Sequence, residues 1–383
     1  MMLAPLEQVA GLALVLVTFA DIFLNVLYAR AGIAILSRPI AHGVRFFFVN
    51  LGRISGRHHG RVLSFCGPAI VVALIVIWVA GLVLGMGMIV HPGLGHGVRP
   101  LIVDAGTDFI TALNVAGGTM ASVGPGPFAA DTPAYKLLFL FDGFIGISIV
   151  GVVITYLMQL YAALQARDEL ALKVELFSRQ TGDAARVVAG LFPEGRLEIG
   201  YPLVTEMAAE LSRVKEAHHL YPVLFYFRFP QAFYELSRFT LVLLDAVALI
   251  RAALEDEAAG WLKRSAGLEH LERGGLVLID TLHHVYLRDD AVGPEAPDPE
   301  QAKAWRARFI RGVGILRAAG LPVRRDVARC ADRYIQLRNR WNDPLLRLGW
   351  AIGHLPHEID PALYEPDPPP QGKAPDPHSA QLH

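Results

Sequence analysis

Three long apolar stretches dominate the first 166 residues of the chain. They lie between Glu7 and Arg30, from Val62 to Val90 and from Leu137 to Ala166, and Asp21 and Asp142 are the only charged residues inside them. About 20 helical residues are needed to cross the roughly 30 Å of hydrocarbon in a bilayer. The pattern therefore predicts three transmembrane helices, with Asp21 in a polar contact between helices.

The charge pattern around these stretches predicts their orientation. Residues 31–61 contain five arginines and no acidic residue, whereas His91–Tyr135 contains Arg99 as its only Lys or Arg. The positive-inside rule places the arginine-rich segment in the cytoplasm. We therefore expect the N-terminus outside a bacterial-type plasma membrane and everything after Arg167 in the cytoplasm. The part Arg38–Phe65, which includes three consecutive phenylalanines, either lies in the headgroup plane or is a plain basic tether.

The rest of the chain has the pattern of a water-soluble helical domain. Phe233–Leu254 and Gln301–Ala319 show apolar residues at three-to-four-residue spacing, which is typical of amphipathic helices. The run Phe239–Ile250 is too short to span a bilayer and is predicted to be a core helix. Within Gln301–Ala319, the part Gln301–Arg317 is interpreted as a domain helix with a basic face or as a helix on the membrane surface. The proline-rich residues 361–383 are predicted to be disordered.

Composition limits the functional classes. The chain has 383 residues, of which 53% are hydrophobic, and its mean hydropathy is +0.38, which is high for a soluble protein. A net charge of −1 gives no reason to expect a nucleic-acid partner. Two distant cysteines indicate neither a disulfide framework nor a metal site, and the three histidine pairs are interpreted as surface residues. We find no nucleotide-binding fingerprint and no catalytic motif, and no ligand of the helical domain can be named.

The segment Thr111–Gly126, TALNVAGGTMASVGPG, lies between the second and third apolar stretches. A helix is predicted over about 106–119, Asp108 is of a residue type that caps helix N-termini, and the segment ends in glycines. Glycine permits positive φ angles that bring successive carbonyl groups to one side, and a helix C-terminus carries partial negative charge. The segment therefore predicts a re-entrant pore loop on a cation path.

This segment resembles the pore-loop potassium channels. In that family a helix ends in T-M-T-T-V-G-Y-G-D, a basic residue follows about ten positions later, and a helix glycine follows about ten beyond that. In this chain the positions of the motif are taken by Thr119, Met120, Ala121, Ser122, Val123, Gly124, Pro125, Gly126 and Pro127. Lys136 corresponds to the basic residue and Gly146 to the helix glycine. The resemblance covers 68–164, about a quarter of the chain.

The resemblance implies a homotetramer that conducts a monovalent cation, in this family K⁺, through a carbonyl-lined filter. The filter would consist of Ser122, Val123, Gly124, Pro125 and Gly126. The resemblance also makes Gly146 the gating hinge of the third transmembrane helix, and Thr119, Asn114 and Asp142 are the residues predicted to support the filter.

The departures from the family pattern affect how the filter is supported. Pro125 replaces the filter tyrosine, Asn114 and Val115 replace the aromatic residues that hold this tyrosine, and Gly118 replaces a bracing carboxylate. We therefore expect a differently supported filter with weaker discrimination between K⁺ and Na⁺. Asp142 lies one helical turn before Gly146, and three roles are open for it. It braces the filter by accepting a hydrogen bond from Asn114, it attracts cations directly, or its side chain reaches the outer interface of the bilayer.

The resulting prediction is an all-α membrane protein with three transmembrane helices, a re-entrant pore helix with its filter loop, and a helical cytoplasmic domain. Its function is predicted to be passive cation conduction, and the alternative is a non-conducting membrane sensor or scaffold that keeps the channel fold. We expect no enzymatic activity, no metal site and no cofactor other than the permeant cation, and the expected partners are further copies of the chain and membrane lipid. The predicted segments are an N-terminal transmembrane helix (1–30), a basic linker (31–61), a pore domain (62–166), the helical domain (167–360) and the tail (361–383).

Overall fold

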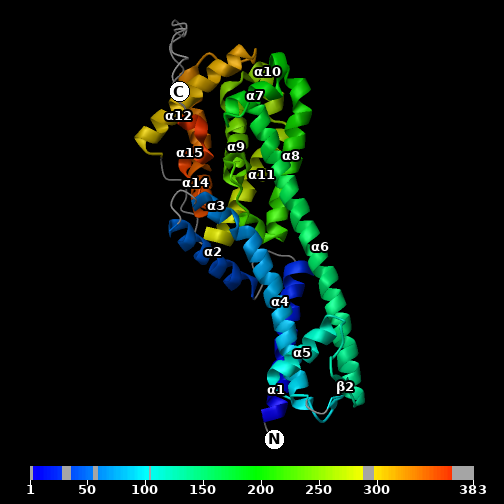
Figure 1. Ribbon diagram of the computed structural model, residues 1–383. Helices are drawn as coiled ribbons and strands as arrows, with labels where there is room; N and C mark the ends of the chain where they lie inside the picture. Colours follow the sequence, from blue (N-terminus) through cyan, green and yellow to red (C-terminus); the bar gives the residue numbers. More distant parts are fainter. Residues whose placement is uncertain (1–2, 28–35, 55–58, 103–104, 288–296, 365–383) are drawn as a thin grey trace, which may run out of the picture.

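A computed structural model describes residues 3–27, 36–54, 59–102, 105–287 and 297–364 (Figure 1). The first part consists of long apolar helices and a short hairpin. Its elements are α1 (Leu3–Ile22), the π-helix η1 (Phe23–Leu27), α2 (Ser37–Ile54), α3 (His59–Ser64), α4 (Cys66–Val90), the 3₁₀-helix η3 (His91–Gly93), β1 (Val98–Pro100), α5 (Phe109–Met120), β2 (Phe128–Ala130) and α6 (Pro133–Phe177).

The second part is a bundle of mostly shorter helices at the other end of the molecule (Figure 1). Its α-helices are α7 (Ala184–Leu191), α8 (Leu197–Leu220), α9 (Leu236–Ala253), α10 (Asp256–Lys263), α11 (Ala266–Leu282), α12 (Pro299–Ala318), α13 (Val327–Asn339), α14 (Asn342–Ala351) and α15 (Pro356–Ile359). The shorter turns are η4 (Pro193–Gly195), η5 (Pro222–Tyr226), η6 (Ala232–Tyr234), η7 (His283–Leu287) and η8 (Pro361–Leu363).

The predicted apolar helices are present in the described residues. By length and composition, three segments can cross a membrane: Ala4–Val26, Cys66–Gly93 and Pro133–Phe177. The second helix begins at Cys66, four residues later than predicted, because residues 59–64 form the separate helix α3. The third is longer than predicted at both ends, and at 1.5 Å per residue its 45 residues extend for about 67 Å, roughly twice the bilayer core.

Close contact between small residues holds α1 against α4. A Cβ added to Gly11 would lie 2.5 Å from the carbonyl oxygen of Gly85, so a larger side chain does not fit there. Asp21, which is fully buried, accepts a hydrogen bond of 2.8 Å from the indole nitrogen of Trp78 on α4. The predicted polar contact between helices is therefore confirmed.

Helix α6 connects the two parts of the molecule without interruption (Figure 1). Arg167, in its second half, is 3% exposed and donates hydrogen bonds of 3.2 Å to the carbonyl oxygens of Leu224 and Phe227. Both carbonyls lie in or next to η5, which also packs against α4. The end of the third apolar helix is thus fastened to the helical bundle by an arginine that belongs to α6 itself.

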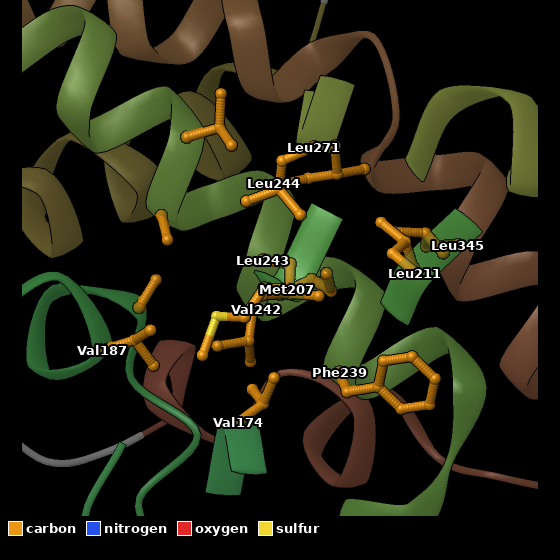
Figure 2. Packing of buried hydrophobic residues seen from close by; sticks show 14 of the residues in the cluster. Val174, Val187, Met207, Leu211, Phe239, Val242, Leu243, Leu244, Leu271 and Leu345 are labelled. Carbon is orange, nitrogen blue, oxygen red and sulfur yellow. The ribbon is translucent and has the colours of Figure 1, made fainter. Parts of the chain in front are cut away.

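The core of the helical bundle surrounds α9. Figure 2 shows Val242, Leu243 and Leu244 of α9 among apolar residues from α8, α11 and α6, and nearly every residue of α9 is buried. The prediction of a core helix over Phe239–Ile250 is therefore confirmed. Asp245, which interrupts this apolar run, accepts hydrogen bonds from Tyr334 (2.6 Å) and Arg338 (3.0 Å).

The helical bundle decides between the two interpretations of α12, and it differs from two other sequence predictions. Trp305 and Phe309 of α12 are 1% and 0% exposed, which agrees with the interpretation of this segment as a domain helix and not with a helix on the membrane surface. His218 is buried instead of lying on the surface, since α8 turns this side toward the core. The predicted disordered tail begins too early, because η8 is ordered and Arg311 donates to the carbonyl oxygen of Ala362; residues 365–383 lie outside the described residues.

Candidate functional site

A short β-hairpin closes the segment that contains α5. β1 pairs with β2 in antiparallel register, with Val98 opposite Ala130 and Pro100 opposite Phe128. Two further backbone hydrogen bonds extend the pairing, from Leu101 to the carbonyl oxygen of Pro127 (2.8 Å) and from Asp131 to that of Gly97 (2.9 Å). The pairing brings the two ends of the segment between the strands together, and this segment contains α5 and the glycine-rich loop.

Asp108 is the N-cap of α5, as predicted from the sequence. Its carboxylate accepts hydrogen bonds from the backbone nitrogen (2.9 Å) and the hydroxyl (3.0 Å) of Thr111. These hydrogen bonds to the charged form hold the pKa of Asp108 below its usual value. The helix begins at Phe109, three residues later than predicted. The reason is that the N-cap residue, Asp108, lies just outside the helix it caps.

Helix α5 is wedged between α4 and α6 (Figure 1). A Cβ on Gly87 of α4 would lie 2.7 Å from the side chain of Leu113, so the glycine makes room for α5. Ala112, Val115 and Ala116 are fully buried. Val115 therefore packs in the small core between the helices.

Gly146 makes the contact between α6 and the end of α5. A Cβ at this position would lie 1.7 Å from the carbonyl oxygen of Met120, a distance that no side chain can have. Gly151, one and a half turns later, has no atom within 4 Å of an added Cβ. Helix α6 continues without a break through both glycines, so in this structure Gly146 has a packing role.

The loop from Ala121 to Pro127 follows α5 and contains the predicted filter residues. Its φ angles are positive at Ser122 (60°), Gly124 (103°) and Gly126 (61°), and negative at the residues between them. Ser122 is a non-glycine residue in the left-handed region, which is uncommon. The prediction that this segment adopts positive φ angles is therefore confirmed at three alternating positions.

Gly118 holds the loop against α5. Its carbonyl oxygen accepts hydrogen bonds from the backbone nitrogens of Val123 (2.9 Å) and Gly124 (3.0 Å). An added Cβ on Gly118 would lie only 2.5 Å from the carbonyl oxygen of Gly124. Any side chain here, including the carboxylate found in the resembling family, would push the loop away. The sequence showed the replacement but not this reason for it.

The predicted supporting residues do not all face the loop. Thr119 is buried, and its hydroxyl donates to the carbonyl oxygen of Val115 (2.8 Å), one turn back in α5. Asn114 is exposed, and its side-chain oxygen lies 3.8 Å from an added Cβ on Gly126. Of the two residues, Asn114 is the one whose side chain lies beside the loop.

Asp142 is fully buried on α6, and neither of its carboxylate oxygens has a hydrogen-bond partner in the described part of the chain. The hydrogen bond from Asn114 that one interpretation of the sequence required is not formed within the single chain. A buried carboxylate without partners is costly, so Asp142 is the residue of α6 whose position calls for an explanation beyond helix packing.

The loop and one face of α6 are open in the single chain. Val123 is 85% exposed, and exposed apolar side chains follow α6 at three-to-four-residue spacing. They are Phe141, Phe144, Ile147, Val150, Ile154, Met158 and Tyr161. An apolar face of this length is available to lipid or to further protein. Among the residues described, no group of three or more His, Cys, Asp or Glu could hold a metal ion.

Comparison with known proteins gives one distant relative. The chain is 20% identical over 291 residues, 76% of its length, to the protein named "Uncharacterized membrane protein YdjJ" of Bacillus subtilis (strain 168), of which it covers 82%. No protein-family model and no solved structure matches the chain. Together with the three long apolar helices, this similarity indicates a helical membrane protein.

Proposed function

We propose that four copies of this chain surround one axis and form a passive pathway for monovalent cations, with K⁺ as the expected ion. The pathway would run past the loop 121–127, and the helical bundle would lie in the cytoplasm of a bacterial-type plasma membrane. In this arrangement α5 is a re-entrant pore helix, and its C-terminal partial negative charge points toward the ion path.

The observation that carries the proposal is the placement of a capped helix and its glycine-rich loop between two membrane-length helices. The φ angles at Ser122, Gly124 and Gly126 are positive and those between them are not, and glycine allows such angles, which a carbonyl-lined filter needs. The loop ends a capped apolar helix wedged between two membrane-length helices. A plain turn between two spans would need neither this helix nor a returning hairpin.

Two features support assembly around an axis. One loop cannot surround an ion, and a carbonyl ring of this type takes four. In the single chain Val123 is 85% exposed and a full face of α6 is uncovered, and neighbouring copies would cover both. The carbonyl oxygen of Gly124 now lies against Gly118, so the proposal requires that assembly turn this carbonyl toward the axis.

The continuous helix α6 supports a regulatory role for the helical bundle. Arg167 fastens α6 to η5, and the same helix contacts the end of α5 at Gly146. A shift of the bundle would therefore move the helix that borders the loop. We infer that the bundle opens or closes the pathway in this way.

Ion flux into liposomes tests the proposal. Purified protein should admit K⁺, admit Na⁺ with weaker discrimination than a tyrosine-containing filter allows, and exclude a large organic cation. Gly124→Ala should abolish flux, because alanine disfavours a φ of 103°. Gly314→Ala, in a helix with open space around it, is the matched control and should conduct like the parent.

Two outcomes would contradict the proposal. A stable monomer in mild detergent would exclude a carbonyl ring, because a single loop cannot enclose an ion. Tetramers whose flux equals that of protein-free liposomes would instead favour the non-conducting sensor or scaffold.

A further inference from the structure

A cavity of about 300 Å³ lies where the two parts of the molecule meet. Its walls come from α2, α3, the beginning of α4, the end of η5 with the segment after it, and the end of α14 with the residues that follow. Arg45 and Arg53 line it from α2, and Arg228 lines it from the segment after η5. Apolar and aromatic side chains complete the wall, among them Leu63, Tyr226 and Trp350.

The cavity is positively charged. None of its lining residues is acidic, and the sequence contains no Asp or Glu from residue 22 to residue 103. Arg45 is held by a hydrogen bond of 2.6 Å to the carbonyl oxygen of Ala351, which does not neutralise its charge. Arg53 is exposed and has no ion-pair or hydrogen-bond partner among the residues the structure describes. Two arginines of α2 are therefore available to an anion.

Arg228 contributes less free charge than the two arginines of α2. It donates hydrogen bonds to the carbonyl oxygen of Gly60 (2.7 Å) and to the ring of His354 (3.0 Å). His354 in turn lies 3.3 Å from Glu235 and 3.2 Å from Glu358. These contacts fix Arg228 as a wall of the cavity, and Arg45 and Arg53 remain the charged groups that face it.

The cavity lies beside the first residue of a membrane-length helix. It includes Cys66, the first residue of the apolar helix α4. On α2, Phe46, Phe47 and Ile54 are 72%, 61% and 84% exposed, while Arg45, Val49 and Arg53, spaced by four residues, line the cavity. A helix with an exposed apolar side and a basic side lies in the headgroup plane, where its arginines meet lipid phosphates.

We propose that this cavity binds the headgroup of an anionic phospholipid, with the lipid phosphate between Arg45 and Arg53. The apolar side of α2 would enter the same leaflet, which in the proposed orientation is the cytoplasmic one. Because Trp350 and Gly353 of the helical bundle share the cavity with Cys66 of α4, the bound lipid would join the bundle to the membrane helices.

Native mass spectrometry of the intact protein with phosphatidylglycerol tests this site. The parent should retain the lipid and melt at a higher temperature with it, because a ligand of the folded state stabilises that state. Phosphatidylcholine and inorganic phosphate should give neither effect. Arg53→Gln should weaken phosphatidylglycerol retention at least fivefold, and Val49→Phe, which fills the cavity without changing charge, should do the same.

Arg61→Gln is the matched control, because Arg61 is an exposed arginine of the neighbouring helix α3 that does not line the cavity. It should retain phosphatidylglycerol within twofold of the parent. Equal losses in Arg53→Gln and Arg61→Gln would mean diffuse charge attraction and overturn the proposal. So would equal retention of phosphatidylcholine, retention by Val49→Phe at the parental level, or a melting shift with inorganic phosphate alone. None of these readouts requires ion flux, so they separate this site from the proposed channel function.

Discussion

The Met120 carbonyl oxygen occupies the space that any side chain on Gly146 would need, since an added Cβ would lie 1.7 Å from it. Met120 is the last residue of α5 and Gly146 is in the first third of α6. The end of α5, and with it the start of the loop, can therefore rest directly on the backbone of α6.

Replacement of this glycine should damage the loop without weakening the helix. Gly146→Ala should abolish ion flux or tetramer assembly, although alanine favours a helix by about 1 kcal/mol over glycine. Gly151→Ala is the control, because an added Cβ there meets nothing within 4 Å. Flux and detergent-solubilised mass measure both variants. Normal conduction by Gly146→Ala would show that α5 can move away from α6 at no cost.

Asp142 should affect stability and conduction in opposite directions. Its carboxylate is buried without a partner, and a charged residue inside a span costs about 2.5–3.5 kcal/mol on insertion scales. Asp142→Asn should therefore raise the melting temperature, while removal of negative charge near the loop lowers cation flux severalfold. The exposed Asp131, just after β2, gives the control variant Asp131→Asn. Parental flux in Asp142→Asn would exclude a role for this charge in the ion path.

His218 should make the protein less stable in acid. Burial lowers the pKa of this histidine to about 4, and Nδ1 lies 2.9 Å from the carbonyl oxygen of Val214. The unfolded chain binds a proton near pH 6.5 and the folded chain only near pH 4. The free energy of unfolding is therefore higher by about 3 kcal/mol above pH 6.5, and this difference is lost as the pH falls toward 4.

Melting temperatures between pH 7.5 and pH 4 check the histidine prediction. The fall in the parent should be smaller in His218→Leu, because leucine has no proton to bind. His219→Leu, at the neighbouring and less buried position, should keep the parental pH dependence. Parallel curves for the parent and His218→Leu would mean that His218 is protonated equally in both states.

Arg338 should be essential for the helical bundle. It is fully buried between Trp305 and Trp341, with its guanidinium carbon 5.3 and 5.4 Å from the two ring centroids. It pairs with Asp245 at 3.0 Å and with Asp360. Arg338→Met should cost about 3–5 kcal/mol, since it leaves buried carboxylates with fewer partners.

Thermal unfolding of the intact protein measures this loss. Arg340→Gln removes a half-exposed arginine that pairs with Glu272 at 3.1 Å, and it should cost less than about 1 kcal/mol. Similar melting temperatures for the two variants would show that the buried arginine contributes no more than a surface ion pair.

The sequence alone determined the features that depend on local pattern. Apolar length identifies the three long helices, because crossing a bilayer sets a minimum number of residues. The cap at Asp108 is readable since its partner, Thr111, is three residues away. The core helix with Asp245 at its centre is readable from the length of its apolar run. In each case the residues that determine the feature belong to one helix or to its cap.

Only the tertiary structure decided which residues from different elements meet. Gly118 must be a glycine because the loop folds back on it, and Gly146 because α5 ends against it. His218 and Arg338 are buried because neighbouring helices cover them. The cavity beside Arg45 and Arg53 takes its walls from segments about 300 residues apart. Such contacts depend on distances between elements, and a pattern along the chain contains no record of those distances.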